Sequence, residues 1–373
     1  MTTTDHPRVA DYLDPGTPPP EFWVAGYPSP VGGADTELDN QITLWRRAGV
    51  EVHLCPCDDV PLDGRQPATV ESVNRRGVHY HEFKWDIFTD KFVLAMCNDG
   101  LLKRLAKIYL GGAPRAVWWA NCMTWPMDAE KECHELGLIT YHAYQSQFQK
   151  TQLLNVLSPL RPVNVWDDYR PWFDADGWSG VVPPITDHIG FGRVSRDDGS
   201  KFTTDLWKML GQIISPHHVK AFVLGFGDNA LEKCGDPAGC PWLDYATYPA
   251  GTIPARELFD RIHVMVHMTG GSKENWPRVV MESWASGVVP IVDNEFGVAE
   301  MVTHGVDGFH AANGIEASWY ASQLAHDDGM RVDMANAGLS HLRDAHTDPE
   351  PAVKSWASLW QDVCARDPVN IRI

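Results

Sequence analysis

The sequence lacks a long hydrophobic run. No apolar stretch in its 373 residues approaches the roughly 20 residues that a helix needs to cross a bilayer, so we expect no membrane span. The opening residues, Met1 to Pro7, do not combine a basic segment with an apolar core, which is the pattern of a secretory signal. The sequence therefore predicts a cytoplasmic protein.

Positive charge is scarce as well. Lys and Arg number 31 against 49 Asp and Glu, which gives a formal net charge of −18. A general nucleic-acid-binding protein presents a basic surface, so the composition argues against that class. It does not exclude an enzyme that touches nucleic acid locally.

Metal-binding patterns are also missing. The eight cysteines include two close pairs, Cys55 with Cys57 and Cys234 with Cys240, whose spacings do not match zinc frameworks. No Asp-x-Asp pattern follows a predicted strand in the second half of the chain. We expect free thiols, as in a reducing cytoplasm, and no metal ion.

Alternating strand and helix patterns fill both halves of the sequence. In the first half, strands are predicted at residues 21–26, 50–54, 78–83, 116–120 and 140–144, and helices at 34–48, 91–95, 101–110 and 145–157. An irregular segment rich in Pro, Gly and Asp, residues 164–178, is typical of a linker. In the second half, strands are predicted at 188–195, 219–224, 263–268, 288–292 and around Phe309, and helices at 205–214, 254–261, 297–303, 315–325, 331–345 and 351–365.

A chain of this length is too long for one typical core. The alternation implies an α/β protein with two doubly wound, Rossmann-like domains facing an interdomain cleft. We place an N-terminal domain at residues 1–178 and a C-terminal domain at 179–348. The final segment, 349–373, is predicted to be a helix that packs back on the N-terminal domain.

One stretch, residues 270–287, combines the features of a binding site. A small-residue loop follows a predicted strand and leads into a helix, and Glu274 and Glu282 stand eight positions apart. A loop that feeds a helix N-terminus after a strand is where α/β proteins bind anions. Gly32 and Gly33 precede an earlier predicted helix in a similar setting, where a tight turn is the alternative interpretation.

Further motifs surround this stretch. They are the Glu274-x7-Glu282 pair, Ala285-Ser286-Gly287, Pro290-Ile291-Val292, Glu295-Phe296-Gly297, Glu300 and Gly305-Val306-Asp307-Gly308-Phe309. Together they resemble the C-terminal donor domain of retaining glycosyltransferases of family 4, which have the GT-B fold. The resemblance extends from about residue 185 to 309 and is thin between about 60 and 175.

The resemblance implies an activity. It implies metal-independent, retaining transfer of a hexose from a nucleotide diphosphate sugar, with a UDP-sugar favoured, to an acceptor hydroxyl. The N-terminal domain would bind the acceptor and the C-terminal domain the donor. No cofactor is expected, because the nucleotide sugar is a substrate.

The same resemblance implies the site residues. Gly192-Arg193 with Lys201 resembles the family's Gly-Arg…Lys pair, which grips the donor diphosphate. Arg193 and Lys201 would stabilise the charge of the leaving phosphate, and Glu274 would hold hydroxyls of the transferred sugar; these three are the expected catalytic residues. The expected donor-binding residues are Gly33, in the N-terminal glycine loop, Glu282, on ribose hydroxyls, and Asn275, Trp276, Pro277 and Arg278.

Three features depart from the family pattern. Asn121-Cys122 stands after the central strand of the N-terminal domain, where many members carry a histidine or aspartate. A longer loop, residues 195–200, separates the two cations of the Gly-Arg…Lys pair, so Arg196 could replace or supplement either one. Trp276-Pro277-Arg278 stands where many members have Phe-Gly, and Pro277 has no N–H to offer a ligand.

The acceptor is left open, and a glycan, a protein or a modified DNA base would each fit. Asn121 and His142 are candidate acceptor-binding residues, and no catalytic residue is assigned in the N-terminal domain. A basic and aromatic cluster points weakly towards an anionic acceptor such as DNA, and a surface cluster without a role is the favoured interpretation. The cluster consists of Arg75, Arg76, His79, His81 and Lys84.

Two other classes of protein remain as alternatives. A sugar-nucleotide epimerase or hydrolase would need a general base, for which Glu274 and His267 are available. A non-catalytic protein would bind a nucleotide sugar or glycan without turnover. The sequence does not decide the sugar, the nucleotide or the oligomeric state.

Overall fold

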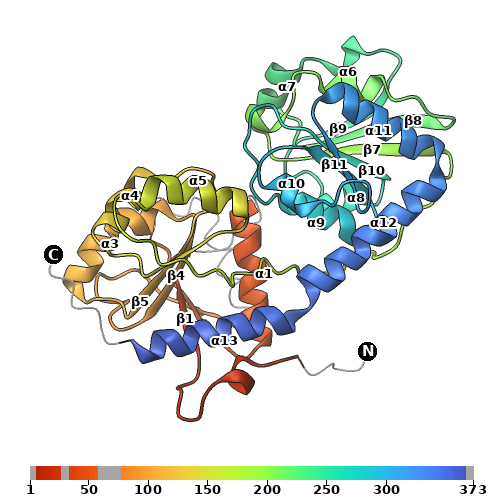
Figure 1. The fold of residues 1–373 in the computed structure, drawn as a ribbon. Helices are drawn as coiled ribbons and strands as arrows, with labels where there is room; N and C mark the ends of the chain where they lie inside the picture. Colours follow the sequence, from red (N-terminus) through yellow and green to blue (C-terminus); the bar gives the residue numbers. More distant parts are fainter. Residues whose placement is uncertain (1–5, 27–32, 58–76, 367–373) are drawn as a thin grey trace. The chain divides into compact units, whose positions relative to one another are not determined.

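The chain divides into two compact units (Figure 1). The structure is a computed structural model that describes residues 6–26, 33–57 and 77–366. Unit 1 is Met1–Asp174 together with Asp348–Ile373, and unit 2 is Ala175–Thr347. Three residues named above, Gly32, Arg75 and Arg76, lie outside the described residues.

Unit 1 is built on a six-stranded parallel sheet in the order β3-β2-β1-β4-β5-β6. Its strands are β1 (Glu21–Val24), β2 (Glu51–Leu54), β3 (His79–Tyr80), β4 (Phe92–Met96), β5 (Ala116–Ala120) and β6 (Tyr141–Ala143). Its α-helices, among the described residues, are α1 (Gly33–Arg47), α3 (Asp99–Gly111), α4 (Asp128–Glu135), α5 (Gln147–Leu157) and α13 (Pro349–Ala365).

Unit 2 has a second parallel six-stranded sheet, in the order β12-β11-β10-β7-β8-β9. Its strands are β7 (His188–Val194), β8 (His218–Leu224), β9 (Asp244–Tyr248), β10 (Val264–His267), β11 (Val289–Asp293) and β12 (Phe309–Ala311). Its α-helices are α6 (Leu206–Gly211), α7 (Asp228–Cys234), α8 (Ala255–Phe259), α9 (Arg278–Ala285), α10 (Val298–Met301), α11 (Gly314–His326) and α12 (Asp328–Leu342).

The two sheets share one topology. When the strands of each unit are numbered along the chain, both sheets have the order 3-2-1-4-5-6 of a Rossmann fold. The order reverses between β1 and β4 in unit 1 and between β7 and β10 in unit 2. Such folds bind ligands at this switch point, at the carboxyl ends of the strands. The prediction of two doubly wound, Rossmann-like domains is confirmed.

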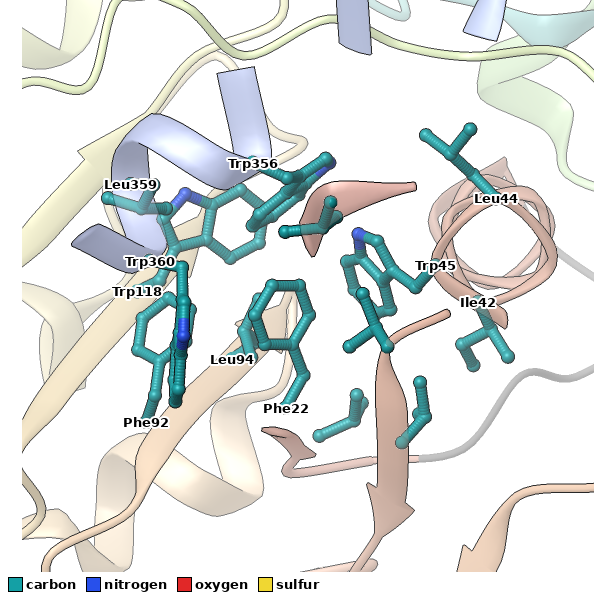
Figure 2. Close-up of a cluster of buried hydrophobic side chains, with 14 of the residues drawn as sticks. Phe22, Ile42, Leu44, Trp45, Phe92, Leu94, Trp118, Trp356, Leu359 and Trp360 are labelled. Atoms are coloured by element: carbon teal, nitrogen blue, oxygen red, sulfur yellow. The ribbon is translucent and has the colours of Figure 1, made fainter. Parts of the chain in front are cut away.

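The C-terminal helix α13 completes the core of unit 1 (Figure 2). Trp356 and Trp360, four residues apart on one face of α13, pack on Phe22 of β1 with ring centroids 5.4 and 5.9 Å from it. Trp45 of α1 lies edge-on to the same phenylalanine at 5.4 Å. The last helix is therefore part of the core of unit 1, although the whole of unit 2, Ala175–Thr347, separates it from the rest of that unit in the sequence.

One predicted helix is wrong. Residues 91–95 do not form a helix, because Phe92–Met96 is the strand β4, which lies between β1 and β5 and is buried along its whole length. A short strand buried on both faces shows no alternation, so its apolar run has the same appearance as a buried turn of helix. The strand β9 and the helices α4 and α7 were not predicted.

The predicted linker at residues 164–178 is irregular, but most of it is packed rather than free. Tyr169 and Trp172 are buried in the core of unit 1, and the division between the units falls after Asp174. Aromatic side chains spaced without a helical or strand period can still fill a core, which a search for periodicity does not detect.

Candidate active site

The stretch around residues 270–287 lies at the switch point of unit 2. The strand β10 ends at His267 beside β7, a loop follows, and α9 begins at Arg278. Gly287, with a φ of 65°, then turns the chain into β11. The predicted order of loop, helix, glycine stop and buried strand is confirmed.

The loop between β10 and α9 is fixed from two sides. Thr269 donates from its N–H and from Oγ1 to Asp293 Oδ2 at the end of β11, at 3.0 and 2.8 Å. The N–H groups of Gly270 and Ser272 both donate to the carbonyl of Ser200, each at 3.1 Å. A β-carbon at position 270 would overlap the backbone carbonyl of Phe202, so only glycine fits there. The loop is therefore preorganised.

Arg193, near the end of β7, is a fully buried cation. Its Nη1 donates to the carbonyl of Val194 at 3.0 Å, and its Nη2 donates to the carbonyl of Lys201. Burial lowers the pKa of Arg193 to about 10, against the opposing charges of Glu274 and Asp293. The guanidinium therefore stays charged at neutral pH and holds the backbone of Lys201 in place.

Lys201 and Glu274 form an ion pair across the two loops. Lys201 Nζ lies 2.6 Å from Glu274 Oε1 and 2.9 Å from Ser272 Oγ. The Lys201 and Glu274 side chains are 21% and 10% exposed, so the pair is largely shielded from water but still reachable. The structure thus brings together three predicted catalytic residues, Arg193, Lys201 and Glu274.

His267, at the end of β10, is the fourth member of this cluster. Burial first, and then the charges of Arg193 and Lys201, hold the pKa of His267 well below its usual value, so the ring is neutral. Its Nδ1 faces Arg193 Nη1, which can only donate, so Nδ1 accepts and the proton resides on Nε2. This buried Nε2–H has no hydrogen-bond partner among the described residues, and it lies 3.9 Å from Glu274 Oε1.

Hydrogen bonds and an ion pair of Asp197 and Asp198 stabilise the conformation of the longer loop after β7. Asp198 Oδ1 accepts from the N–H and Oγ of Ser200, and its Oδ2 pairs with Arg196 at 3.0 Å. Asp197 caps the first turn of α7, accepting from the N–H of Ala230 at 2.9 Å. Arg196 is exposed and belongs to this turn, so its ion pair lies with Asp198.

The remaining predicted donor-binding residues of unit 2 lie on the loop and on α9. Asn275 and Arg278 are buried, Pro277 is the residue just before the helix, and Trp276 is partly buried with its ring 5.9 Å from that of His346. Glu282 is partly buried one turn after Arg278, and burial raises the pKa of its carboxyl while the Arg278 charge opposes the shift.

Three predicted site residues belong to unit 1. Gly33 is exposed at the first position of α1. Asn121 and His142 are buried, at 0% and 1% exposure. Asn121 Nδ2 donates to Glu130 Oε2 at 2.6 Å, and Asn121 Oδ1 accepts from the N–H of Met123 at 2.7 Å. The Asn121 side chain therefore shapes the loop after β5 from inside.

His142 belongs to a buried polar chain. His134 Nε2 donates to the carbonyl of Arg161 at 3.0 Å, so His134 Nδ1 accepts from His142 Nε2 at 3.1 Å. His142 Nδ1 then presents a lone pair to Glu130 Oε1 at 3.9 Å. Burial lowers the pKa of His142 to about 3 and raises that of Glu130 to about 7. A protonated Glu130 suits this arrangement.

Two residues of the site were not predicted. Asp293 and Thr269 fix the loop, and burial raises the pKa of the Asp293 carboxyl while the Thr269 hydrogen bonds oppose the shift. Asp293 is the last residue of the buried strand β11. A polar residue at the carboxyl end of a parallel strand is a sequence signal for a ligand site.

Neither a metal cluster nor a membrane-spanning helix is present among the described residues. Within residues 6–26, 33–57 and 77–366, no group of His, Cys, Asp or Glu has the geometry of a metal site. None of the helices in these ranges is long and apolar enough to span a membrane.

Part of unit 2 matches a known protein family. Residues 251–341, which contain β10, the loop and α9, match the family model described as Glycosyl transferases group 1. No curated protein matches the sequence significantly.

Several solved structures have a similar fold. HepE from Anabaena, in complex with UDP and glucose, is 14% identical with a TM-score of 0.67, and the alignment covers 92% of this chain and 99% of that one. Sucrose-phosphate synthase from Thermosynechococcus elongatus is 11% identical with a TM-score of 0.65, covering 93% and 100%. TarM is 9% identical with a TM-score of 0.69, also covering 93% and 100%. The matched segment in unit 2 and the fold shared by both units support the assignment of this chain as a glycosyltransferase with the GT-B fold.

Proposed function

We propose that the protein transfers a hexose from a nucleotide diphosphate sugar to an acceptor hydroxyl, with retention of configuration and without a metal ion. The observation that carries this proposal is the ion pair of Lys201 and Glu274 beside the buried Arg193, at the switch point of unit 2. A uridine nucleotide is favoured, because the similar structure of HepE contains UDP and glucose.

The cations account for the donor diphosphate. When the glycosidic bond breaks, negative charge grows on the leaving phosphate, and preorganised positive charge in a water-poor site stabilises it. Lys201 Nζ is the cation that can move, since its partners among the described residues, Ser272 Oγ and Glu274 Oε1, are side-chain atoms. Arg193 is engaged with two backbone carbonyls, so it acts through its field and by fixing the backbone of Lys201.

Glu274 accounts for the sugar. Donor binding exchanges its ion pair with Lys201 for new partners: the ammonium turns to the diphosphate and the carboxylate accepts hydrogen bonds from sugar hydroxyls. His267 Nε2–H supplies a further buried donor beside the same carboxylate. Each group therefore gains a complementary partner when the substrate enters.

The loop and α9 account for the nucleoside. In this proposal Glu282 accepts hydrogen bonds from the ribose hydroxyls, and the neighbouring residues Asn275, Trp276, Pro277 and Arg278 contribute to the donor site. The N-terminus of α9 adds a favourable field for the phosphates, although Pro277 contributes no N–H. The anomeric configuration is retained if the acceptor hydroxyl attacks the anomeric carbon from the same face that the leaving phosphate departs from. The leaving phosphate then takes the proton of the acceptor hydroxyl.

The epimerase or hydrolase alternative is weakened by the state of His267. Its Nδ1 accepts from Arg193 and its Nε2 already carries a proton, so the ring has no free lone pair with which to act as a base. Only Glu274 remains for that role, and it is paired with Lys201. A transferase needs neither group as a base.

Incubation with each of a panel of nucleotide sugars, with and without added acceptors, tests the proposal. We expect one nucleoside diphosphate to be released, faster with acceptor, and in the presence of EDTA as well as without it. Conversion of the sugar without any acceptor would favour the epimerase. Binding without turnover under any acceptor would favour a non-catalytic protein, and loss of activity in EDTA with rescue by a divalent ion would contradict the metal-independent mechanism.

A further inference from the structure

A second cluster of reactive groups lies at the switch point of unit 1. Cys97 directly follows β4, and Cys122 follows β5, the next strand of the sheet. The hydrogen bonding between β4 and β5 continues past the end of β4: the N–H of Cys97 donates to the carbonyl of Ala120 at 2.9 Å. Both cysteines are free and partly exposed.

The two cysteines are in direct contact. The N–H of Cys122 donates to Cys97 Sγ at 3.0 Å. Cys97 has a φ of 50°, a left-handed conformation that is rare for a residue with a β-carbon. Backbone strain of this kind concentrates at functional sites, and here it accompanies the contact between Cys97 Sγ and the Cys122 amide.

The surroundings make the two thiols unequal. The Cys122 thiol, followed by the N–H groups of Cys122 and Met123, lowers the pKa of Cys97 against its burial. The hydrogen bond to Cys97 raises the pKa of Cys122, helped by burial and by the charges of Cys97, Glu37 and Asp35. Cys97 is therefore the more acidic thiol of the pair and Cys122 the less acidic one.

We propose that Cys97 and Cys122 form a thiol modification site, in which Cys97 attacks low-molecular-weight disulfides and Cys122 resolves the adduct. Cys97 thiolate displaces one thiolate from a disulfide R–S–S–R and forms a mixed disulfide. Cys122 then loses its proton to solvent and attacks Cys97 Sγ, which releases the second R–S⁻. The two protein thiols lose two protons and two electrons, and the reagent is reduced to two thiols.

The strand geometry permits the product. Neighbouring strands lie about 4.8 Å apart, and a disulfide joins Cα atoms roughly 4.4–6.8 Å apart. Cys97 and Cys122 stand at the ends of such neighbours. The bond would tie the end of β4 to the loop that begins with Asn121, whose side chain is already fixed by Glu130.

The test is treatment of the native, full-length protein with oxidised glutathione, followed by blocking of free thiols and tryptic mapping. Cleavage at the basic residues gives peptides 92–103 and 116–131, each with one cysteine. We expect these two peptides to be recovered as a linked pair that dithiothreitol separates. Recovery of both as blocked, unlinked peptides, while other cysteines react, would overturn the proposal.

Two variants distinguish the roles of the thiols. Cys122→Ser should trap glutathione on Cys97, and Cys97→Ser should leave Cys122 largely unmodified. Equal modification of Cys122 in the presence and absence of Cys97 would contradict the assignment. Cys234 is the internal control, because it is partly exposed but burial raises its pKa to about 11.

A kinetic measurement on the unmutated protein does not depend on the folding of either variant. Alkylation by iodoacetamide near neutral pH follows the thiolate fraction, so Cys97 should react at least about tenfold faster than Cys234. Rates within a factor of two of each other would overturn the proposal.

Discussion

The two units share a strand order but carry different chemistry at the same point of it. At the switch point of unit 2, Arg193 and His267 stand on neighbouring strands, next to the Lys201–Glu274 pair. At the switch point of unit 1, Cys97 lies beside a buried polar chain in which Glu130 holds Asn121. One topology therefore supplies the position, and the residues after each strand determine what is bound there.

The comparison also separates what holds each site in place. In unit 2, a backbone carbonyl holds the guanidinium of Arg193, and the N–H groups of Gly270 and Ser272 hold the adjoining loop. The positive charge is therefore in place before any ligand binds. In unit 1, the loop is held by side-chain hydrogen bonds from Asn121 and Glu130. The first arrangement suits stabilisation of a charged donor, and the second shapes a surface.

The largest expected effect is that of Lys201→Ala. Removing the mobile cation should reduce turnover by about 10² to 10³-fold, as the loss of one preorganised stabilising group does in other enzymes. It also leaves Glu274 without its ion-pair partner. Initial rates with saturating acceptor measure the effect, and Lys208→Ala, on α6 of the same unit, is a matched control that should keep normal turnover. Near-normal turnover of Lys201→Ala would contradict the role of this cation in catalysis. The switch point of unit 2 would then no longer differ from that of unit 1 in supplying catalytic charge.

The next effect concerns unit 1 and depends on pH. Glu130 has its pKa raised to about 7 from 4.5 by burial, so the folded protein favours the protonated form. The raised pKa of Glu130 contributes to the free energy of unfolding in full below the unfolded-state pKa of 4.5. This contribution is lost as the pH rises through the folded-state pKa of about 7. Glu130→Gln keeps the shape of the side chain without its charge. Its free energy of unfolding, relative to that of the unmutated protein, should therefore rise by about 3 kcal/mol between pH 4 and pH 8.

Urea unfolding at a series of pH values measures this gain. Glu132→Gln, an exposed glutamate on the same helix, is the control and should show no such trend. A Glu130→Gln curve parallel to that of the unmutated protein would mean that the Glu130 carboxyl is not buried in this way.

A pair of substitutions at His267 sharpens the account of unit 2. Asn can offer its oxygen to Arg193 but loses the Nε2–H, whereas Gln can place an N–H near the Nε2 position but loses the acceptor for Arg193. We expect His267→Asn to keep stability and lose about tenfold in donor affinity, in line with one hydrogen bond to a charged group. His267→Gln should keep more affinity but lose about 1–3 kcal/mol of stability. Equal loss of both properties in the two variants would show that His267 only fills space.

The smallest expected effect is that of Arg196→Ala. Its guanidinium is exposed and pairs with Asp198, and such surface pairs contribute about 0–1 kcal/mol. Turnover and melting temperature should both stay close to those of the unmutated protein. A loss comparable to that of Lys201→Ala would place Arg196 on the donor phosphates, as the sequence alone allowed.

Much of this arrangement follows from sequence patterns, and the exceptions have physical reasons. The loop, helix and strand around Glu274 were predictable because each has its own local signal. The strand β4 was not, because a strand buried on both faces has no period. The ion pair of Lys201 with Glu274 and the proton position on His267 depend on contacts between segments about 70 residues apart, which no local pattern records.

The most direct test of the central claim is nucleotide-sugar binding measured by thermal shift on the unmutated protein and on Lys201→Ala. A ligand that binds the folded state at 100 times its Kd stabilises by about 2.7 kcal/mol, enough to raise the melting temperature by a few degrees. We predict that one nucleotide diphosphate sugar, a uridine one first, produces this rise in the unmutated protein and little or none in Lys201→Ala. No rise with any uridine, guanosine, adenosine or thymidine diphosphate sugar, or an equal rise in both proteins, would contradict the account.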